Sequence, residues 1–230
     1  MDMPEEERSR GESPELTGAP QGALCHMPVN YSQGEEQKHI LEHAGDSGRF
    51  LDIGAWHAKN LSNTRALYER GWSGVLVEPS PEPFLGLLKE YGEDERISLV
   101  CACVGGVETL AQFHASADAL STSSQENFEK WRAVGGFYGR FYSPRVELDY
   151  LMERFGEFDF VSIDAEGSSV QIFGDLLCLP RFIDGIGLPK CICVEHDGRN
   201  AETLLMATAA GYREVYFSGE NQVFARGING

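Results

Sequence analysis

The chain has 230 residues, a hydrophobic content of 42% and a formal net charge of −17. This length suits one α/β domain plus a tail, and the hydrophobic content is enough for a sizeable core. The negative charge disfavours nucleic acid and anionic membranes as partners, because both would repel it. No apolar run approaches the roughly 20 residues of a membrane span.

The first 28 residues are rich in Glu, Ser, Gly and Pro and show no hydrophobic period. Such a composition cannot bury enough apolar surface to fold on its own. We therefore expect a disordered acidic tail at 1–28 and a single domain over 29–230. The opening MDMPEEERSRGESPE is too acidic and polar for a signal peptide.

Beyond the tail, helical and strand patterns alternate along the chain. Helices are predicted at 31–45, 62–70, 82–91, 146–155, 168–177 and 201–210, the first with Ser32 as cap and Glu35 completing a capping box. Strands are predicted at 50–53, 75–77, 97–104, 158–163 and 191–194, with a short extra strand at 112–116 and a closing hairpin of 214–217 and 222–225. Residues 120–145 are expected to be irregular.

Strands that alternate with helices predict a Rossmann-like α/β fold with a mainly parallel seven-stranded sheet. Helices should cover both faces, and the hairpin should add a C-terminal antiparallel element. In such sheets ligands bind beyond the carboxyl ends of the strands, where the strand order reverses. The residues that follow each strand are therefore the candidates for a functional site.

Four of the six cysteines lie in apolar strand-like runs, as the pairs Cys101/Cys103 and Cys191/Cys193. We interpret them as buried free thiols. Zinc is the lesser alternative, because C-x-C pairs on strands are not the usual ligand spacing. Free thiols suit a reducing compartment, so we expect the protein to be cytoplasmic.

The first two strands favour one type of cofactor. The first carries Asp52 and breaks at Gly54, and the second ends in Glu78, 24 residues after Gly54. That spacing suits a carboxylate that accepts hydrogen bonds from ribose hydroxyls. The G-x-G-x-x-G and P-loop glycines for phosphate are missing, and Asp52 would repel pyrophosphate, which makes an NAD-dependent enzyme a weak alternative. A cationic adenosine compound, S-adenosylmethionine, fits better than an ordinary turn with a solvated acid.

Four blocks of sequence resemble FkbM-type methyltransferases, a family with the class I S-adenosylmethionine-dependent fold. The blocks are YSQGEEQKHIL at 31–41, FLDIGAWHAKNLSNT at 50–64, GWSGVLVEPSPEPFLGL at 71–87, and DFVSIDAEGSSVQIF at 159–173 followed by CICVEHD at 191–197. The chain departs from the family pattern in its shortened SQGEE lead-in, in the bulky Trp56–His57 pair and in Ser169. These departures bear on the substrate more than on the fold.

The resemblance implies a cofactor site. Asp52 and Gly54 would line the methionine end, and Glu78 would accept from the two ribose hydroxyls. The full set expected to bind the cofactor is Asp52, Gly54, Ala55, Asn63, Glu78, Pro79, Ser80, Cys103, Val104 and Asp164. The structural alternatives are an exposed strand-end acid at Glu78 and plain core around Cys103.

Catalytic candidates follow the next two strands. Asp164 could act as a general base or orient the cofactor's ammonium group, and His196 is the other candidate base, because its ordinary pKa lies near neutrality. A histidine that is already hydrogen-bonded or faces solvent is the competing interpretation of His196. Asp164, Glu195 and Asp197 could form an oxygen-ligand site for Mg²⁺, although acids at strand ends often hold no metal.

The 120–145 segment combines aromatic and basic side chains and is expected to cover the substrate. Aromatic faces beside arginines suit a sugar ring or a carboxylated or phosphorylated acceptor; alternatively the aromatics simply pack a small lid. The residues expected to contact the substrate are Trp56, His57, Glu166, Trp131, Tyr138 and Arg140. We therefore predict O-methylation of a hydroxyl on a sugar or another small metabolite, with a non-catalytic binding protein of the same fold as the alternative.

Overall fold

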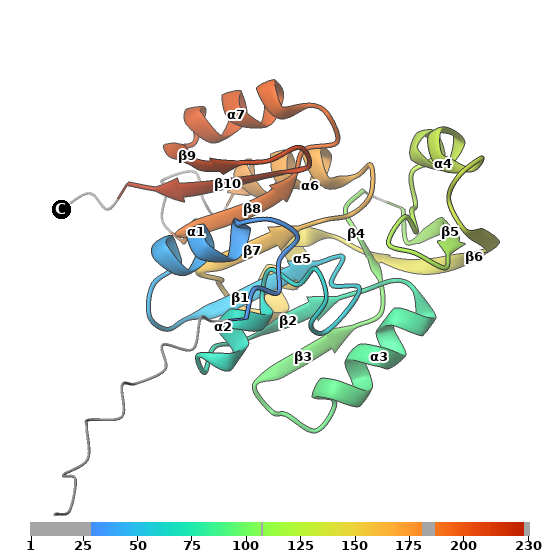
Figure 1. The fold of residues 1–230 in the computed structure, drawn as a ribbon, viewed down its shortest axis with the longest axis horizontal. Coiled ribbons are helices and arrows are strands. Elements are labelled where there is room, and N and C mark those ends of the chain that lie inside the picture. The colour runs from blue at the N-terminus through green and yellow to red at the C-terminus, as the bar shows by residue number, and fades with distance from the viewer. Residues whose placement is uncertain (1–28, 107, 181–186, 228–230) are drawn as a thin grey trace, which may run out of the picture.

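The computed structural model describes residues 29–106, 108–180 and 187–227, so the tail predicted at 1–28 lies outside the described residues. Its main sheet is built from β1 Arg49–Ile53, β2 Ser73–Val77, β3 Ile97–Val100, β7 Phe160–Ile163, β8 Cys191–Glu195, β9 Tyr212–Phe217 and β10 Asn221–Arg226. These strands stand in the order β3-β2-β1-β7-β8-β10-β9 (Figure 1). The first five in that order are parallel, and β10 runs antiparallel to both β8 and β9. The predicted Rossmann-like sheet with a C-terminal antiparallel hairpin is confirmed.

Helices cover both faces of this sheet. One face carries α1 Glu36–His43, α2 Arg65–Glu69 and α3 Pro81–Tyr91, and the other carries α5 Leu148–Phe155, α6 Ser169–Leu177 and α7 Asn200–Ala209. Side chains along β1 point alternately to the two faces of the sheet. Phe50 therefore packs with the first set of helices, and Leu51 and Ile53 pack with the second. No helix within the described ranges is long and apolar enough to cross a membrane.

A smaller sheet projects from one end of the main sheet (Figure 1). It consists of β4 Cys103–Val104, β5 Leu110–Ser116 and β6 Phe137–Val146 in the order β4-β6-β5, and α4 Gln125–Trp131 lies between β5 and β6 in the sequence. Two expectations are corrected here. The single strand predicted at 97–104 is split between the two sheets, and the 120–145 segment contains a helix and a ten-residue strand.

Local chemistry explains why the 120–145 segment, called the insert below, is ordered. The hydroxyl of Ser124 accepts a hydrogen bond from the backbone N–H of Asn127 and so caps α4. Along β6, Phe141 and Ser143 face inward while Tyr138, Arg140 and Tyr142 are exposed, which is the two-residue period of a strand. Two glycines before the strand and another inside it hide that period in the sequence.

Smaller differences occur at helix starts and at one thiol. Ser32 does not cap α1; its hydroxyl donates to Asn63 Oδ1 instead, at 2.8 Å. Just ahead of α2, the hydroxyl of Ser62 accepts from the N–H of Arg65 at 3.1 Å. Cys101 is exposed because it lies in the break between β3 and β4, whereas Cys103, Cys191 and Cys193 are buried free thiols as predicted.

Candidate functional site

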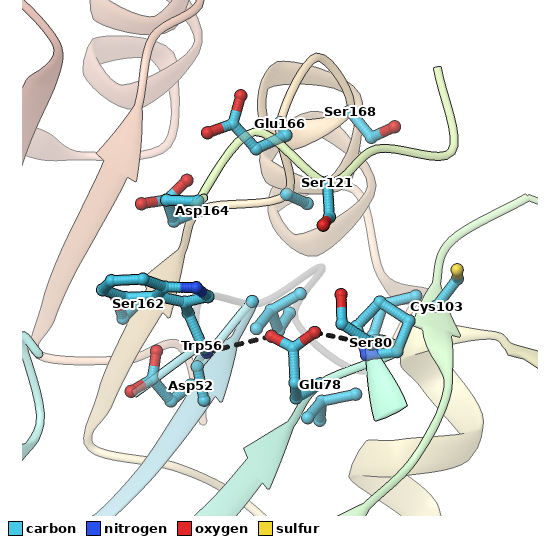
Figure 2. A pocket seen from close by; sticks show the side chains of 18 of the residues that line it. Asp52, Trp56, Glu78, Ser80, Cys103, Ser121, Ser162, Asp164, Glu166 and Ser168 are labelled. Atoms are coloured by element: carbon cyan, nitrogen blue, oxygen red, sulfur yellow. Dashed lines mark hydrogen bonds between the residues drawn. The ribbon is translucent and has the colours of Figure 1, made fainter. Parts of the chain in front are cut away.

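A pocket opens at the carboxyl ends of β1, β2 and β7, where the strand order reverses (Figure 2). It encloses about 860 Å³ of space that no atom fills, including the part open to solvent. All ten predicted cofactor residues line it, as do two of the predicted substrate residues, Trp56 and Glu166. The sheet therefore brings together side chains that are spread over more than a hundred residues of sequence.

Gly54 forms the floor of the pocket directly after β1. Its φ is +82°, a conformation that favours glycine. A Cβ at this position would lie 1.6 Å from the carbonyl oxygen of Asp164, so the two strand ends approach too closely for a side chain. The N–H groups of Gly54 and Ala55 donate to the carbonyl of Val77 and hold the bend against β2.

Glu78 is buried at the end of β2 and points into the pocket (Figure 2). Its two carboxylate oxygens accept hydrogen bonds from backbone N–H groups, Oε2 from Trp56 at 2.9 Å and Oε1 from Ser80 at 2.6 Å. Burial raises the pKa of Glu78, and these hydrogen bonds oppose that rise. Each carboxylate oxygen retains capacity for a further donor, as a diol would supply.

Asp52 lies deeper in the pocket, at 4% exposure. The hydroxyl of Thr64 donates to its Oδ2 at 2.6 Å. Burial raises the pKa of Asp52 to about 6, against the hydrogen bonds from Thr64 and Ser162. Nearby, the amide of Asn63 is engaged with Ser32 and Ser162, so that side chain forms a fixed part of the wall.

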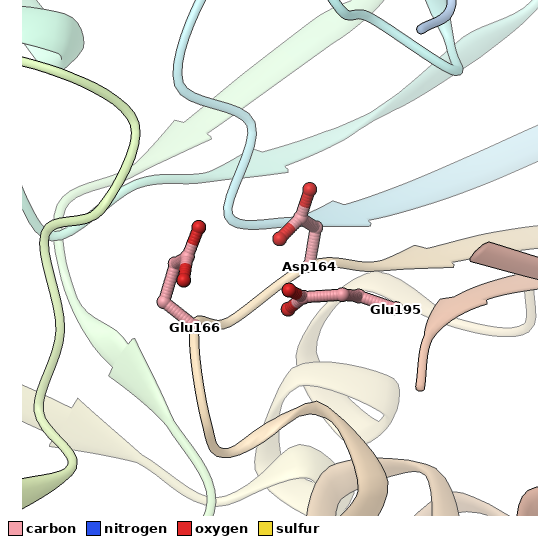
Figure 3. Close-up of side chains that lie close together, drawn as sticks. All are labelled: Asp164, Glu166 and Glu195. Carbon is pink, nitrogen blue, oxygen red and sulfur yellow. The ribbon is translucent and has the colours of Figure 1, made fainter. Parts of the chain in front are cut away.

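Three carboxylates gather above this floor. Oxygen atoms of Asp164, Glu166 and Glu195 all lie within 4.8 Å of one another (Figure 3). Burial raises the pKa of each carboxyl, and so does the negative charge of its neighbours, to about 8 for Glu166. Asp164 and Glu166 line the pocket, and Glu195 lies behind Asp164 with its Oε2 accepting from the Ser169 hydroxyl at 3.1 Å.

This cluster differs from the predicted magnesium set, because Glu166 stands where Asp197 was expected. Asp197 instead accepts a hydrogen bond from the N–H of Gly167 at 3.0 Å. An acidic cluster of this kind occurs without metal in many proteins. We assign no metal ion to it.

His196 lies outside the pocket lining. Its Nδ1 accepts from the N–H of Gly198 at 3.0 Å, its Nε2 donates to the carbonyl of Ser218 at 3.3 Å, and its ring stacks on Phe217. Both ring nitrogens are thus used by the backbone, which matches the competing interpretation of a hydrogen-bonded structural histidine. The geometry leaves Asp164 as the candidate base.

The remaining predicted substrate residues also lie away from the pocket. His57 is exposed and accepts from two backbone N–H groups through Nδ1, and Trp131 lies under Nζ of Lys130. Tyr138 and Arg140 lie on the exposed side of β6. The smaller sheet reaches the pocket through other residues.

Sequence reasoning missed several lining residues that have small or apolar side chains. These are Leu61, Ser62, Phe113, Ala119, Ser121, Ser123, Ser162 and Ser168, among others. The serine-rich run at 121–124 was the available signal, since small polar residues in a covering loop suit contact with a ligand. Backbone strain marks the same region, because Trp56, Leu61 and Glu166 all have positive φ and all line the pocket.

A family model described as the methyltransferase FkbM domain matches residues 52–213. Among solved structures, Sp1610 of Streptococcus pneumoniae is similar with a TM-score of 0.43 and 12% identity, over 83% of this chain and 68% of that one. The fibrillarin pre-rRNA processing protein of Methanococcus jannaschii gives 0.41 and 12%, over 81% and 69%. The methyltransferase PaMTH1 of Podospora anserina, bound to SAH, gives 0.41 and 11%, over 78% and 71%. No curated protein matches the chain.

Proposed function

Because the chain belongs to the FkbM methyltransferase family and is thus an S-adenosylmethionine-dependent methyltransferase, we propose that it methylates a hydroxyl of a sugar or another small metabolite. One observation carries this proposal: the backbone carbonyl of Asp164 lies against the Gly54 bend, and its side chain lines the same pocket as Glu78. That arrangement offers a place for the cofactor and a proton acceptor next to it.

The pocket suits a cofactor of this kind. Gly54 leaves the space that a side chain would fill, and Asp52, Glu78 and Asp164 supply negative charge for a sulfonium and an ammonium group. We assign the ribose hydroxyls to Glu78 and the methionine end to Asp52, and Asp164 to the acceptor. When bound, S-adenosylmethionine supplies an activated methyl group, so the protein needs mainly to align the acceptor and exclude water.

Asp164 is the proposed general base. Its carboxylate would accept the proton of the acceptor hydroxyl, a role worth roughly 10²–10⁴-fold in rate. Burial and the neighbouring Glu166 raise its pKa from the ordinary range, which makes its ionised form a better proton acceptor. Ser169 donates to Glu195 and so steadies the carboxyl behind Asp164.

Calorimetry and transfer of an isotope-labelled methyl group test the proposal together. We expect S-adenosylmethionine to bind, and a Glu78→Gln variant to bind on the order of tenfold or more weakly, because the amide replaces an acceptor oxygen with a donor. Glu153→Gln is the matched control, since Glu153 is exposed on α5 and away from the pocket. Absence of cofactor binding to the intact protein would refute the proposal.

Transfer of the label separates the enzyme from a non-catalytic binding protein of the same fold. An Asp164→Asn variant should retain cofactor binding better than Glu78→Gln, yet lose methyl transfer to a hydroxyl acceptor by roughly 10²-fold or more. Binding without transfer to any hydroxylated compound would favour the non-catalytic alternative. Equal transfer rates in Asp164→Asn and the wild type would remove Asp164 from its role.

A further inference from the structure

The charge of the pocket lining bears on the kind of acceptor. Four carboxylates line it, those of Asp52, Glu78, Asp164 and Glu166. Among the residues that the structure describes, no Lys, Arg or His lines it. Protonation of one or two of these carboxyls would reduce the negative charge but would still provide no cation. The pocket therefore holds groups that repel an anion and no charged group that binds one.

None of the four cations of the insert, which could have bound an anionic acceptor, lines the pocket. Arg132 pairs with Glu129 at 3.0 Å, and Arg145 lies 3.9 Å from Glu108. The remaining two point to the surface: Lys130 lies over the ring of Trp131, and Arg140 is on the exposed side of β6. The carboxylated or phosphorylated acceptor suggested by these residues in the sequence thus loses its support.

The part of the pocket across from Glu78 is lined by a different set of polar side chains. Glu166, Ser121 and Ser168 lie on that side, across the pocket from Glu78 and Ser80 (Figure 2). Glu166 is held in place, because its Oε2 accepts from Asn127 Nδ2 at 3.2 Å and its carbonyl accepts from the Thr122 hydroxyl. Because the cofactor is assigned to Glu78 and Asp52, the acceptor would bind on the side of Glu166, Ser121 and Ser168.

An anionic acceptor would be strongly disfavoured there. Like charges in a pocket shielded from water repel far more than they do in bulk solvent, and an anion would lose its hydration without gaining a cationic partner. S-adenosylmethionine carries one net positive charge, which cannot balance the whole lining. Lys130 and Arg199 act on Asp197, which lies outside the lining, and Arg145 acts on the lining residue Cys103 but does not itself line the pocket.

Resting on the proposed function, we propose that the site is selective against anions: the acceptor is a hydroxyl compound without phosphate or carboxylate groups. Serine hydroxyls and carboxylates are suitable partners for neutral hydroxyl groups and for ammonium groups, because they accept hydrogen bonds from both. Sugars, polyols and amino sugars fit this chemistry. Sugar phosphates and uronic acids do not.

A defined acceptor mixture tests this selectivity. Neutral sugars and polyols, amino sugars, sugar phosphates and uronic acids are incubated at equal concentration with the full chain and methyl-labelled S-adenosylmethionine. Unreacted cofactor is adsorbed on charcoal, a reaction without protein is subtracted, and the products are separated by anion exchange. We expect at least ten times more label in the unretained fraction than in the retained one. A majority of label in the retained, anionic fraction would overturn the inference while leaving the methyltransferase activity established.

A variant tests whether the charge of the pocket lining causes this selectivity. Assayed above pH 8, where Glu166 is ionised, Glu166→Gln should raise the share of label in the anionic fraction, on the order of tenfold, because it removes one negative charge from the acceptor side. Glu153→Gln removes the same charge from an exposed helix and should leave the distribution unchanged. An equal shift in both variants would mean that overall charge, and not the pocket, sets the preference. Failure of the wild type to bind cofactor in calorimetry would instead refute the proposed function.

Discussion

At the scale of single residues, Gly54 has the strictest requirement in the site. Its positive φ strains any other residue, and a Cβ would overlap the Asp164 carbonyl oxygen. We expect Gly54→Ala to push β1 and β7 apart at their ends, to lower the free energy of unfolding by more than about 1 kcal/mol, and to abolish cofactor binding. Urea denaturation and calorimetry measure the two effects.

Gly86 is the matched control. It lies in the exposed part of α3, and a Cβ there would meet nothing within 4 Å. Gly86→Ala should raise stability by roughly 0.5–1 kcal/mol, the difference in helix propensity, and leave cofactor affinity unchanged. Cofactor binding by Gly54→Ala at wild-type affinity would contradict the role of the bend.

Among the structural elements, α4 and the loop after β7 are joined by hydrogen bonds and close packing. Asn127 on α4 donates to Glu166, Thr122 donates to the Glu166 carbonyl, and a Cβ on Gly167 would lie 2.8 Å from the Asn127 Cβ. The loop that carries Asp164 and Glu166 is thereby packed against the insert. A substitution that removes this contact should therefore affect both the insert and the acidic cluster.

We expect Asn127→Ala to loosen α4, because it removes the hydrogen bond to Glu166, worth about 0.5–1.5 kcal/mol. The backbone amides of α4 should exchange with solvent up to roughly tenfold faster, and methyl transfer should fall. Glu126→Ala on the same helix is the control, since Glu126 is exposed and away from the pocket. Unchanged exchange in α4 of Asn127→Ala would show that Thr122 and packing suffice.

At the scale of the whole molecule, the buried acids set a pH dependence of stability. Burial raises the pKa of Asp52 to about 6 and that of Glu166 to about 8, so the folded state favours their neutral forms. This contribution is complete below the unfolded-state pKa values and is lost as pH rises through the folded ones. For Asp52 the loss is about 3 kcal/mol, at about 1.4 kcal/mol for each pKa unit.

The ligand-free protein should therefore lose stability between pH 5 and pH 8.5, as measured by urea denaturation at several pH values. Glu166→Gln should flatten the upper part of that curve, and Glu153→Gln should follow the wild type. The carboxyls whose pKa is lowered, such as Glu90 and Asp118, act below this range. Stability that rises with pH across it would contradict the buried, cation-free state of the acids.

The sequence predicted the main sheet and the strand-end residues well, because these follow from local patterns. Apolar runs mark β1, β2, β7 and β8, and the hairpin of β9 and β10 is marked by its turn. The sequence did not predict the ordered insert, because glycines hide the two-residue alternation of side chains along β6. It left two interpretations of His196 open, because only the packing of the chain decides that its ring meets backbone groups and not the pocket.

Local residue patterns were enough to place the strands and helices of the main sheet along the chain, and with them the residues at the carboxyl ends of those strands. They determined the glycine bend as well, since a missing side chain is a local property. The packing of the folded chain was needed to show that Ser121 and Ser123 reach the pocket and that the arginines of the insert do not. The direction of a side chain relative to a cavity depends on how segments distant in sequence pack, and a residue pattern does not contain that information.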